Sequence, residues 1–104
     1  MQTQYYLKNV ELNAGTKEKM EKKLDHLSKY QKSLNFKMAQ IDISRDTHHR
    51  KGDVFRVEIN VEIPKKSLRA VETGPDMLMA FDLAAEKVDR QAREEKDRQG
   101  KREK

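Results

Sequence analysis

The strongest constraint on the fold is an alternation of apolar and polar residues between positions 55 and 63. Phe55, Val57, Ile59, Val61 and Ile63 alternate with Arg56, Glu58, Asn60 and Glu62. A period of two is typical of a half-buried antiparallel strand, with one face on the core and the other in water. Ala39, Ile41 and Ile43 alternate in the same way. The sequence therefore predicts two strands of a sheet that has one wet face.

Two further strands are predicted from shorter patterns. The link Pro64-Lys65-Lys66-Ser67, which follows the strand predicted over 55–63, is short enough for a hairpin into Leu68–Thr73. Glu72 falls on the apolar parity of that segment, which predicts that the strand ends or twists away there. Near the N-terminus, Thr3–Val10 carries Tyr5 and Leu7 on one parity and is a weaker strand candidate.

Two other segments have a helical period. In the first, apolar residues recur at Met20, Leu24, Leu27 and Leu34, and Asn13 is placed to be the N-cap. In the second, they recur at Met77, Phe81, Ala84 and Val88. Gly74-Pro75-Asp76 favours a helix start because Pro is tolerated in the first turn and Asp suits the positive end of the helix dipole. The predicted order is β-α-β-β-β-α, an α+β fold in which a four-stranded sheet has two helices packed on one face.

The length and the charge distribution predict the domain organisation. A chain of 104 residues is one domain. Residues 93–104 contain no apolar side chain, so we expect a folded domain over 1–92 and a charged helix end or disordered tail over 93–104 that buries nothing. With no membrane-length apolar run, no signal-peptide pattern and no cysteine, we expect a cytoplasmic protein without a disulfide framework.

The first predicted helix segregates its charges. At about 100° per residue, one flank and the outer surface carry Lys19, Lys22, Lys23, His26, Lys29 and Tyr30, with no acid among them. Glu18, Glu21 and Asp25 gather on the opposite flank. Segregation gives a local positive field, and unpaired lysines on one face suit phosphate groups. The alternative interpretation is an ordinary solvated helix face.

Charges on the second predicted helix are mixed. Lys87 and Arg90 lie outside its apolar stripe. Opposite charges recur four residues apart at Glu86–Arg90, Asp89–Arg93, Arg90–Glu94, Glu94–Arg98 and Asp97–Lys101. Such pairs usually support a helix rather than a ligand, and we interpret the charges from Arg98 onward in this way. Lys87 has no acid four residues away in either direction, so we expect it to be freer.

The link between two of the predicted strands contains His48-His49-Arg50-Lys51-Gly52. Adjacent histidines rarely bind one metal ion, and no third ligand accompanies them, so we expect no metal site. A plain loop or an exposed basic loop that meets a phosphate backbone is the expected alternative, with Lys65, Lys66 and Arg69 adding positive charge at the next hairpin. With no cysteine nucleophile, glycine-rich phosphate loop or Ser-His-Asp arrangement, we expect neither an enzyme nor a cofactor.

Several strings, in order, resemble those of one family. Asn9-Val10-Glu11-Leu12 follows the first predicted strand, and Lys23-Leu24, Leu27 and Tyr30 close the first helix. Asp76-Met77, Ala80-Phe81-Asp82 and Lys87-Val88-Asp89-Arg90-Gln91 follow at the family's spacing. Over about residues 1–92 the chain resembles the short bacterial ribosome hibernation factors, the hibernation-promoting factor and ribosome-associated inhibitor group, once called sigma-54 modulation proteins.

The resemblance implies a fold similar to double-stranded RNA-binding domains and a partner, the small ribosomal subunit and its rRNA. It implies a translation inhibitor that occupies the decoding channel and excludes mRNA and tRNA in stationary phase or stress. Family positions that face rRNA match Lys22, Lys23, His26, Lys29, Lys87 and Arg90. We therefore expect no membrane or small-molecule partner, and a monomer away from the ribosome. Two other functions remain open: a protein-interaction module that modulates a transcription factor, and a general double-stranded RNA binder.

Overall fold

A computed structural model of the chain describes residues 1–46 and 54–102. The elements are β1 (Gln2–Lys8), α1 (Ala14–Leu24), the 3₁₀-helix η1 (Asp25–Tyr30), α2 (Gln31–Leu34), β2 (Met38–Arg45), β3 (Phe55–Ile63), β4 (Lys66–Gly74) and α3 (Met77–Arg102). The sequence 47–53, which contains the predicted basic loop with His48, lies outside the described residues.

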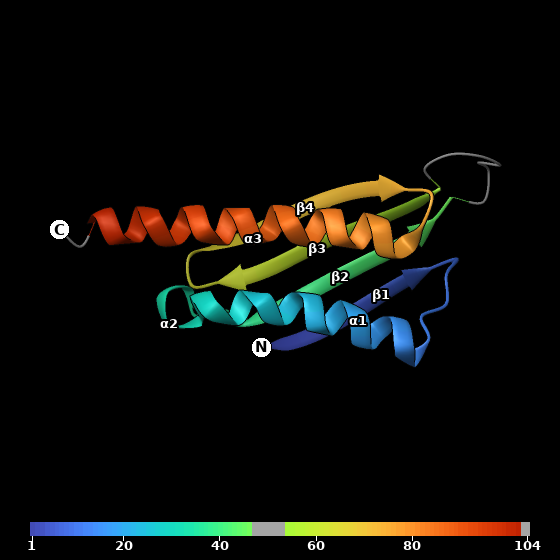
Figure 1. Ribbon diagram of the computed structural model, residues 1–104, viewed down its shortest axis with the longest axis horizontal. Coiled ribbons are helices and arrows are strands. Elements are labelled where there is room, and N and C mark those ends of the chain that lie inside the picture. The colour runs from blue at the N-terminus through green and yellow to red at the C-terminus, as the bar shows by residue number, and fades with distance from the viewer. Residues whose placement is uncertain (47–53, 103–104) are drawn as a thin grey trace.

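The four strands form one sheet in the order β1-β2-β3-β4. β1 pairs with β2 in parallel, and the other two pairings are antiparallel. In register, Ile41 lies opposite Ile59, which lies opposite Ala70. The first helical segments and α3 lie side by side in front of the same sheet face (Figure 1). The predicted α+β fold, with its β-α-β-β-β-α order of elements and its helices on one face of a four-stranded sheet, is confirmed.

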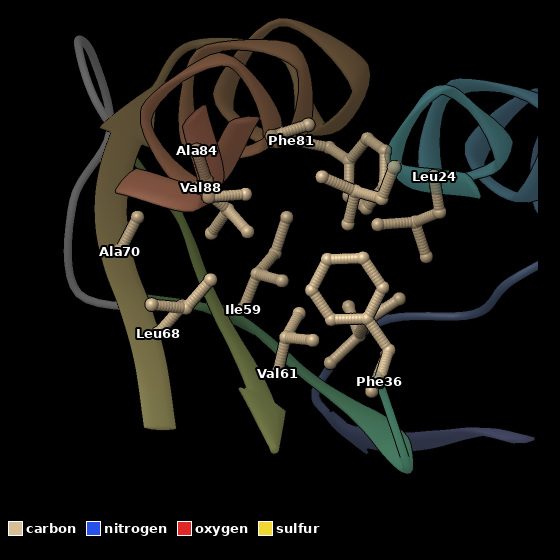
Figure 2. Packing of buried hydrophobic residues seen from close by; sticks show 14 of the residues in the cluster. Leu24, Phe36, Ile59, Val61, Leu68, Ala70, Phe81, Ala84 and Val88 are labelled. Carbon is tan, nitrogen blue, oxygen red and sulfur yellow. The ribbon is translucent and has the colours of Figure 1, made fainter. Parts of the chain in front are cut away.

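The core lies between that sheet face and the helices. Met20 of α1, Phe81 and Val88 of α3, and the inward residues of the strands are inaccessible or nearly so. Figure 2 shows Phe81 directed between α3 and Leu24, and Val88 above the sheet residues Ile59 and Leu68. The alternation read from the sequence therefore marks the residues that the helices cover.

Two side chains start the helices where the sequence predicts. The Oδ1 of Asn13 accepts a hydrogen bond from the backbone N–H of Thr16 at 2.8 Å. The Oδ1 of Asp76 accepts one from the backbone N–H of Met79 at 3.0 Å. Each bond satisfies a backbone donor that has no partner within the helix.

The first helical stretch is not the single α-helix that the sequence predicts. It passes from α1 into the 3₁₀-helix η1 and then into α2, where Asn35 ends it in the left-handed region at φ 55°. A 3₁₀-helix has three residues per turn, so residues three apart eclipse one another. Leu24, Leu27 and Tyr30 consequently form one buried row. The prediction that Tyr30 lies on the exposed basic arc is wrong for this reason.

Two strand ends also differ from the expected ones. β1 ends at Lys8, before Asn9 adopts φ 59°, and Leu7 is 43% exposed rather than facing the core with Tyr5. β4 continues through Glu72 to Gly74. The strand tolerates this acid on the helix side because Lys87 of α3 forms an ion pair with it.

Polar contacts fasten α3 along the outer edge of β4. The side-chain amide of Gln91 donates to the carbonyl oxygen of Arg69 at 2.7 Å, and its Oε1 accepts from the Arg69 backbone N–H at 3.0 Å. One turn further, Glu95 is 6% exposed and bonds to the Lys66 ammonium at 3.0 Å. The expectation that nothing after residue 92 is buried is therefore wrong at Glu95.

The molecule is elongated because α3 extends beyond the sheet. Its principal dimensions are 53 × 24 × 19 Å, and the C-terminal turns of α3 project past the hairpin that joins β3 to β4 (Figure 1). None of the helices in the described residues combines the length and the apolar character needed to cross a bilayer.

Replacing the buried tyrosine of η1 tests the three-residue repeat. Tyr30 is 5% exposed and Tyr6 is 51% exposed. We expect Tyr30→Ala to lower the free energy of unfolding by about 3 kcal/mol or more, as for other buried aromatics, and Tyr6→Ala by less than about 1 kcal/mol. Urea denaturation of both variants measures this. Equal losses would show that Tyr30 does not belong to the core.

Replacing the glutamine that fastens α3 tests the contact with β4. Gln91→Ala removes two hydrogen bonds, so we expect a loss of about 1–2 kcal/mol in unfolding free energy. Gln99→Ala, on the part of α3 that projects beyond the sheet, is the matched control and should cost less than about 0.5 kcal/mol. A Gln91 variant as stable as this control would contradict the role of these bonds.

Candidate nucleic-acid interface

The 3₁₀ geometry of η1 aligns three basic residues along one edge. Lys23 lies in the last turn of α1, and His26 and Lys29 follow at steps of three residues. Because side chains three apart eclipse one another in a 3₁₀-helix, this row lies beside the buried row of Leu24 and Leu27. The row faces α3, where Lys23 and Lys29 both find acidic neighbours.

A hollow of about 260 Å³ separates η1 from α3. Its lining combines Lys23, Leu24, His26, Leu27 and Lys29 with Ala85, Glu86, Asp89, Arg90 and Arg93 of α3. The apolar members form part of the core beneath it, and the charged members surround its opening. Five basic side chains, from α1, η1 and α3, therefore gather around two carboxylates.

The lysines of this hollow are ion-paired, although the sequence predicts them to be unpaired. The Lys23 Nζ lies 3.8 Å from the Glu86 Oε1, and the Lys29 Nζ lies 3.4 Å from the Asp89 Oδ1. Lys22 also has a partner, Glu18, at 3.6 Å. Since these distances are long and at least one side chain of each pair is more than half exposed, each pair contributes little to stability.

Lys29 has a second neighbour, Tyr30, which belongs to the buried row of η1. Its Nζ lies 5.0 Å from the centroid of the Tyr30 ring. The Tyr30 side chain, and after it the charge of Asp89, raise the pKa of the Lys29 ammonium against the opposing effect of desolvation. Both neighbours thus favour the charged form of this amine.

Unlike the lysines of the hollow, His26 and the two arginines form no ion pair within the described part of the chain. Within residues 1–46 and 54–100, no acidic group lies within ion-pair distance of His26, Arg90 or Arg93. The spacing of four residues from Glu86 to Arg90 and from Asp89 to Arg93 therefore does not lead to ion pairs within α3. Glu86 and Asp89 turn toward the lysines of the neighbouring segment instead, and two guanidinium groups are left free to bind an anion.

The structure brings together four of the six predicted rRNA-binding residues. Lys23, His26, Lys29 and Arg90 line the same hollow. Lys22 is exposed outside it, and Lys87 lies toward β4, where it pairs with Glu72. The expectation that Lys87 is freer than its neighbours is therefore wrong, because its partner comes from a strand that is distant in sequence.

Three charged members of the hollow, Glu86, Asp89 and Arg93, are not among the predicted binding residues. Arg93 lies three residues after Arg90, so it returns to the same side of an α-helix, and this spacing could have identified it. Glu86 and Asp89 have no comparable signal, since their partners belong to another element. Packing of α3 against η1 decides which charges meet.

The opposite edge of η1 carries the other sign of charge. Asp25, Ser28 and Gln31 are again three residues apart and line a hollow of about 530 Å³ against β1, together with Glu21. Burial, followed by the charge of Glu21, raises the pKa of the nearby Tyr5 to about 12. The charge segregation predicted for this stretch is thus kept, with its basic edge toward α3 and its acidic edge toward β1.

Other predicted basic groups are engaged elsewhere. Lys66 bonds to Glu95, and the Arg69 guanidinium bonds to Glu58 at 2.9 Å. Among the described residues, no group of three or more His, Asp or Glu side chains is arranged to hold a metal ion. In the hollow between η1 and α3, by contrast, His26, Arg90 and Arg93 form no ion pair within the described residues.

Comparison with known proteins places the chain in a family. The sequence matches the family described as Sigma 54 modulation protein / S30EA ribosomal protein over residues 3–100. The N-terminal domain of Thermus thermophilus Protein Y is 27% identical, with a TM-score of 0.73 over 88% of this chain and 96% of that one. A ribosomal subunit interface protein from Coxiella burnetii has the same fold, with a TM-score of 0.77 at 22% identity over 93% of this chain and 99% of its own. With its fold and nearly its whole length matched, the chain belongs to the Sigma 54 modulation protein / S30EA ribosomal protein family.

Proposed function

We propose that this protein is a ribosome-associated translation inhibitor that binds rRNA of the small subunit in the decoding channel. There it occupies the space of mRNA and tRNA, and it acts in stationary phase or stress. The proposal requires no catalysis, cofactor or small-molecule substrate. We also propose that the protein acts in the cytoplasm and is a monomer when it is not bound to the ribosome.

The observation that carries this proposal is the convergence of cations around the hollow between η1 and α3. His26, Arg90 and Arg93 form no ion pair among the described residues, and the ion pairs of Lys23 and Lys29 are long, at 3.8 and 3.4 Å. Phosphate groups supply the matching charge and are dense along an RNA backbone. Folded RNA is recognised largely through its shape and its phosphates, because side chains do not reach into its deep groove.

Membership in a family described in part as ribosomal protein supports a ribosomal rather than a free RNA target. The name of the Coxiella burnetii protein, which shares the fold, points to the surface between ribosomal subunits. An elongated body of 53 Å suits a channel that the protein fills along its length. mRNA and tRNA would then be excluded simply because the protein occupies their space.

Charge reversal on the first helical stretch tests the proposal. We expect the triple change Lys22→Glu, Lys23→Glu and Lys29→Glu to abolish co-sedimentation with small ribosomal subunits, because each change replaces attraction to phosphate with repulsion. Lys8→Glu, Lys17→Glu and Lys37→Glu give a control variant with the same net charge, altered outside the hollow. This control should keep most of its binding.

Two results would contradict the proposal. If the triple variant binds as well as the wild type, the positive edge of η1 is not the binding surface. If binding does not weaken along a log–log line with salt, at a slope of about −0.7 to −0.9 per phosphate, then the partner is not RNA and a protein partner is favoured. Competition by bulk duplex RNA as strong as that by small subunits would indicate a general double-stranded RNA binder.

A further inference from the structure

Two carboxylates line the hollow between η1 and α3 together with its basic residues. Glu86 and Asp89 of α3 share its lining with Lys23, Lys29 and two arginines. A surface that only had to attract phosphate would do so better without them, since a negative charge near a phosphate repels it. Their presence therefore needs a reason.

Stability does not supply that reason. The Lys23–Glu86 pair spans 3.8 Å with side chains 31% and 60% exposed, and the Lys29–Asp89 pair spans 3.4 Å with side chains 56% and 30% exposed. Ion pairs of this kind contribute little. In addition, the Oδ1 of Asp89 is shielded from solvent and accepts no hydrogen bond. A shielded carboxylate oxygen that is satisfied only by a distant ammonium is an unfavourable feature that folding alone would not favour.

We infer that Glu86 and Asp89 compete with phosphate for Lys23 and Lys29. They remain ion-paired with the two lysines until the phosphates of a phosphate-dense partner displace the carboxylates. The inference rests on the proposed function, since it assumes that RNA phosphates enter this hollow. Each lysine exchanges a carboxylate for a phosphate, so the gain from one phosphate is small. Only a partner that engages several cations at once, including the free Arg90 and Arg93, binds firmly. The two acids thereby weaken the binding of RNA that does not engage several of these cations at once.

Displacement of the carboxylates by phosphate changes how the affinity for RNA depends on salt concentration. Binding of a free lysine to phosphate releases a counterion from the RNA. When the lysine leaves a carboxylate, that carboxylate takes up a cation from solution, which offsets part of the release. Removing the carboxylates should therefore make the salt dependence steeper, whereas a purely structural role would not change the slope.

The experiment measures binding of bulk duplex RNA to the full chain across a range of salt concentrations. We compare the wild type, Glu86→Gln, Asp89→Asn and the double variant. Glu62→Gln, an exposed acid on β3 that does not line this hollow, is the control with the same change of charge. Circular dichroism and urea denaturation verify that each variant folds as the wild type does.

We expect each single variant to bind about threefold more tightly at low salt, and the double variant about tenfold, from loss of a charge about 4–6 Å from the phosphate. The log–log slope should steepen by up to about 0.7–0.9 per carboxylate removed. Glu62→Gln should match the wild type in both. Unchanged or weaker binding, an unchanged slope, or the same gain in Glu62→Gln would each overturn the inference.

A parallel sedimentation assay with small ribosomal subunits separates this inference from the proposed function. If the wild type fails to co-sediment while the variants show the steeper slope, the proposed ribosomal target is wrong and the competition by Glu86 and Asp89 stands. If the wild type co-sediments and the slopes are the same, the proposed function stands and the competition is refuted.

Discussion

Apolar contact between one sheet face and the helices determines where the charged groups of the hollow lie. Phe81 of α3 is directed toward Leu24 and the sheet, and its complete burial fixes the distance between α3 and the first helical stretch (Figure 2). The hollow above this contact exists because two helices of round cross-section meet along a line and diverge above it. Its charged residues therefore depend on the core beneath them, although none of them belongs to it.

Most of the fold could be predicted from the sequence because burial imposes a regular period. The alternation at Val57, Ile59 and Val61 marks the covered sheet face, and the caps at Asn13 and Asp76 are local bonds. Each of these signals needs only neighbouring residues. Contacts made across the fold, such as the pair of Glu72 with Lys87, could not be predicted in this way because no local period connects the two.

The candidate site was predicted in part for the same reason. The sequence located the positive edge of the first helical stretch, but an angle of 100° per residue moved Tyr30 onto it. Successive apolar spacings of three, at Leu24, Leu27 and Tyr30, indicate three residues per turn and would have corrected this. The acids of the hollow are beyond such reasoning, since which lysine Glu86 or Asp89 meets depends on how two elements pack.

The bonds from Gln91 to the backbone of Arg69 bear on how the molecule tolerates crowding. Open strand edges are the usual route by which folded chains join into extended sheets. Here the backbone N–H and carbonyl of Arg69, on the outer edge of β4, are already bonded to a side chain of the same molecule. A strand from another copy could not pair continuously along β4 without first displacing Gln91. The side chain that fastens α3 to the sheet therefore also opposes the addition of a foreign strand at this edge.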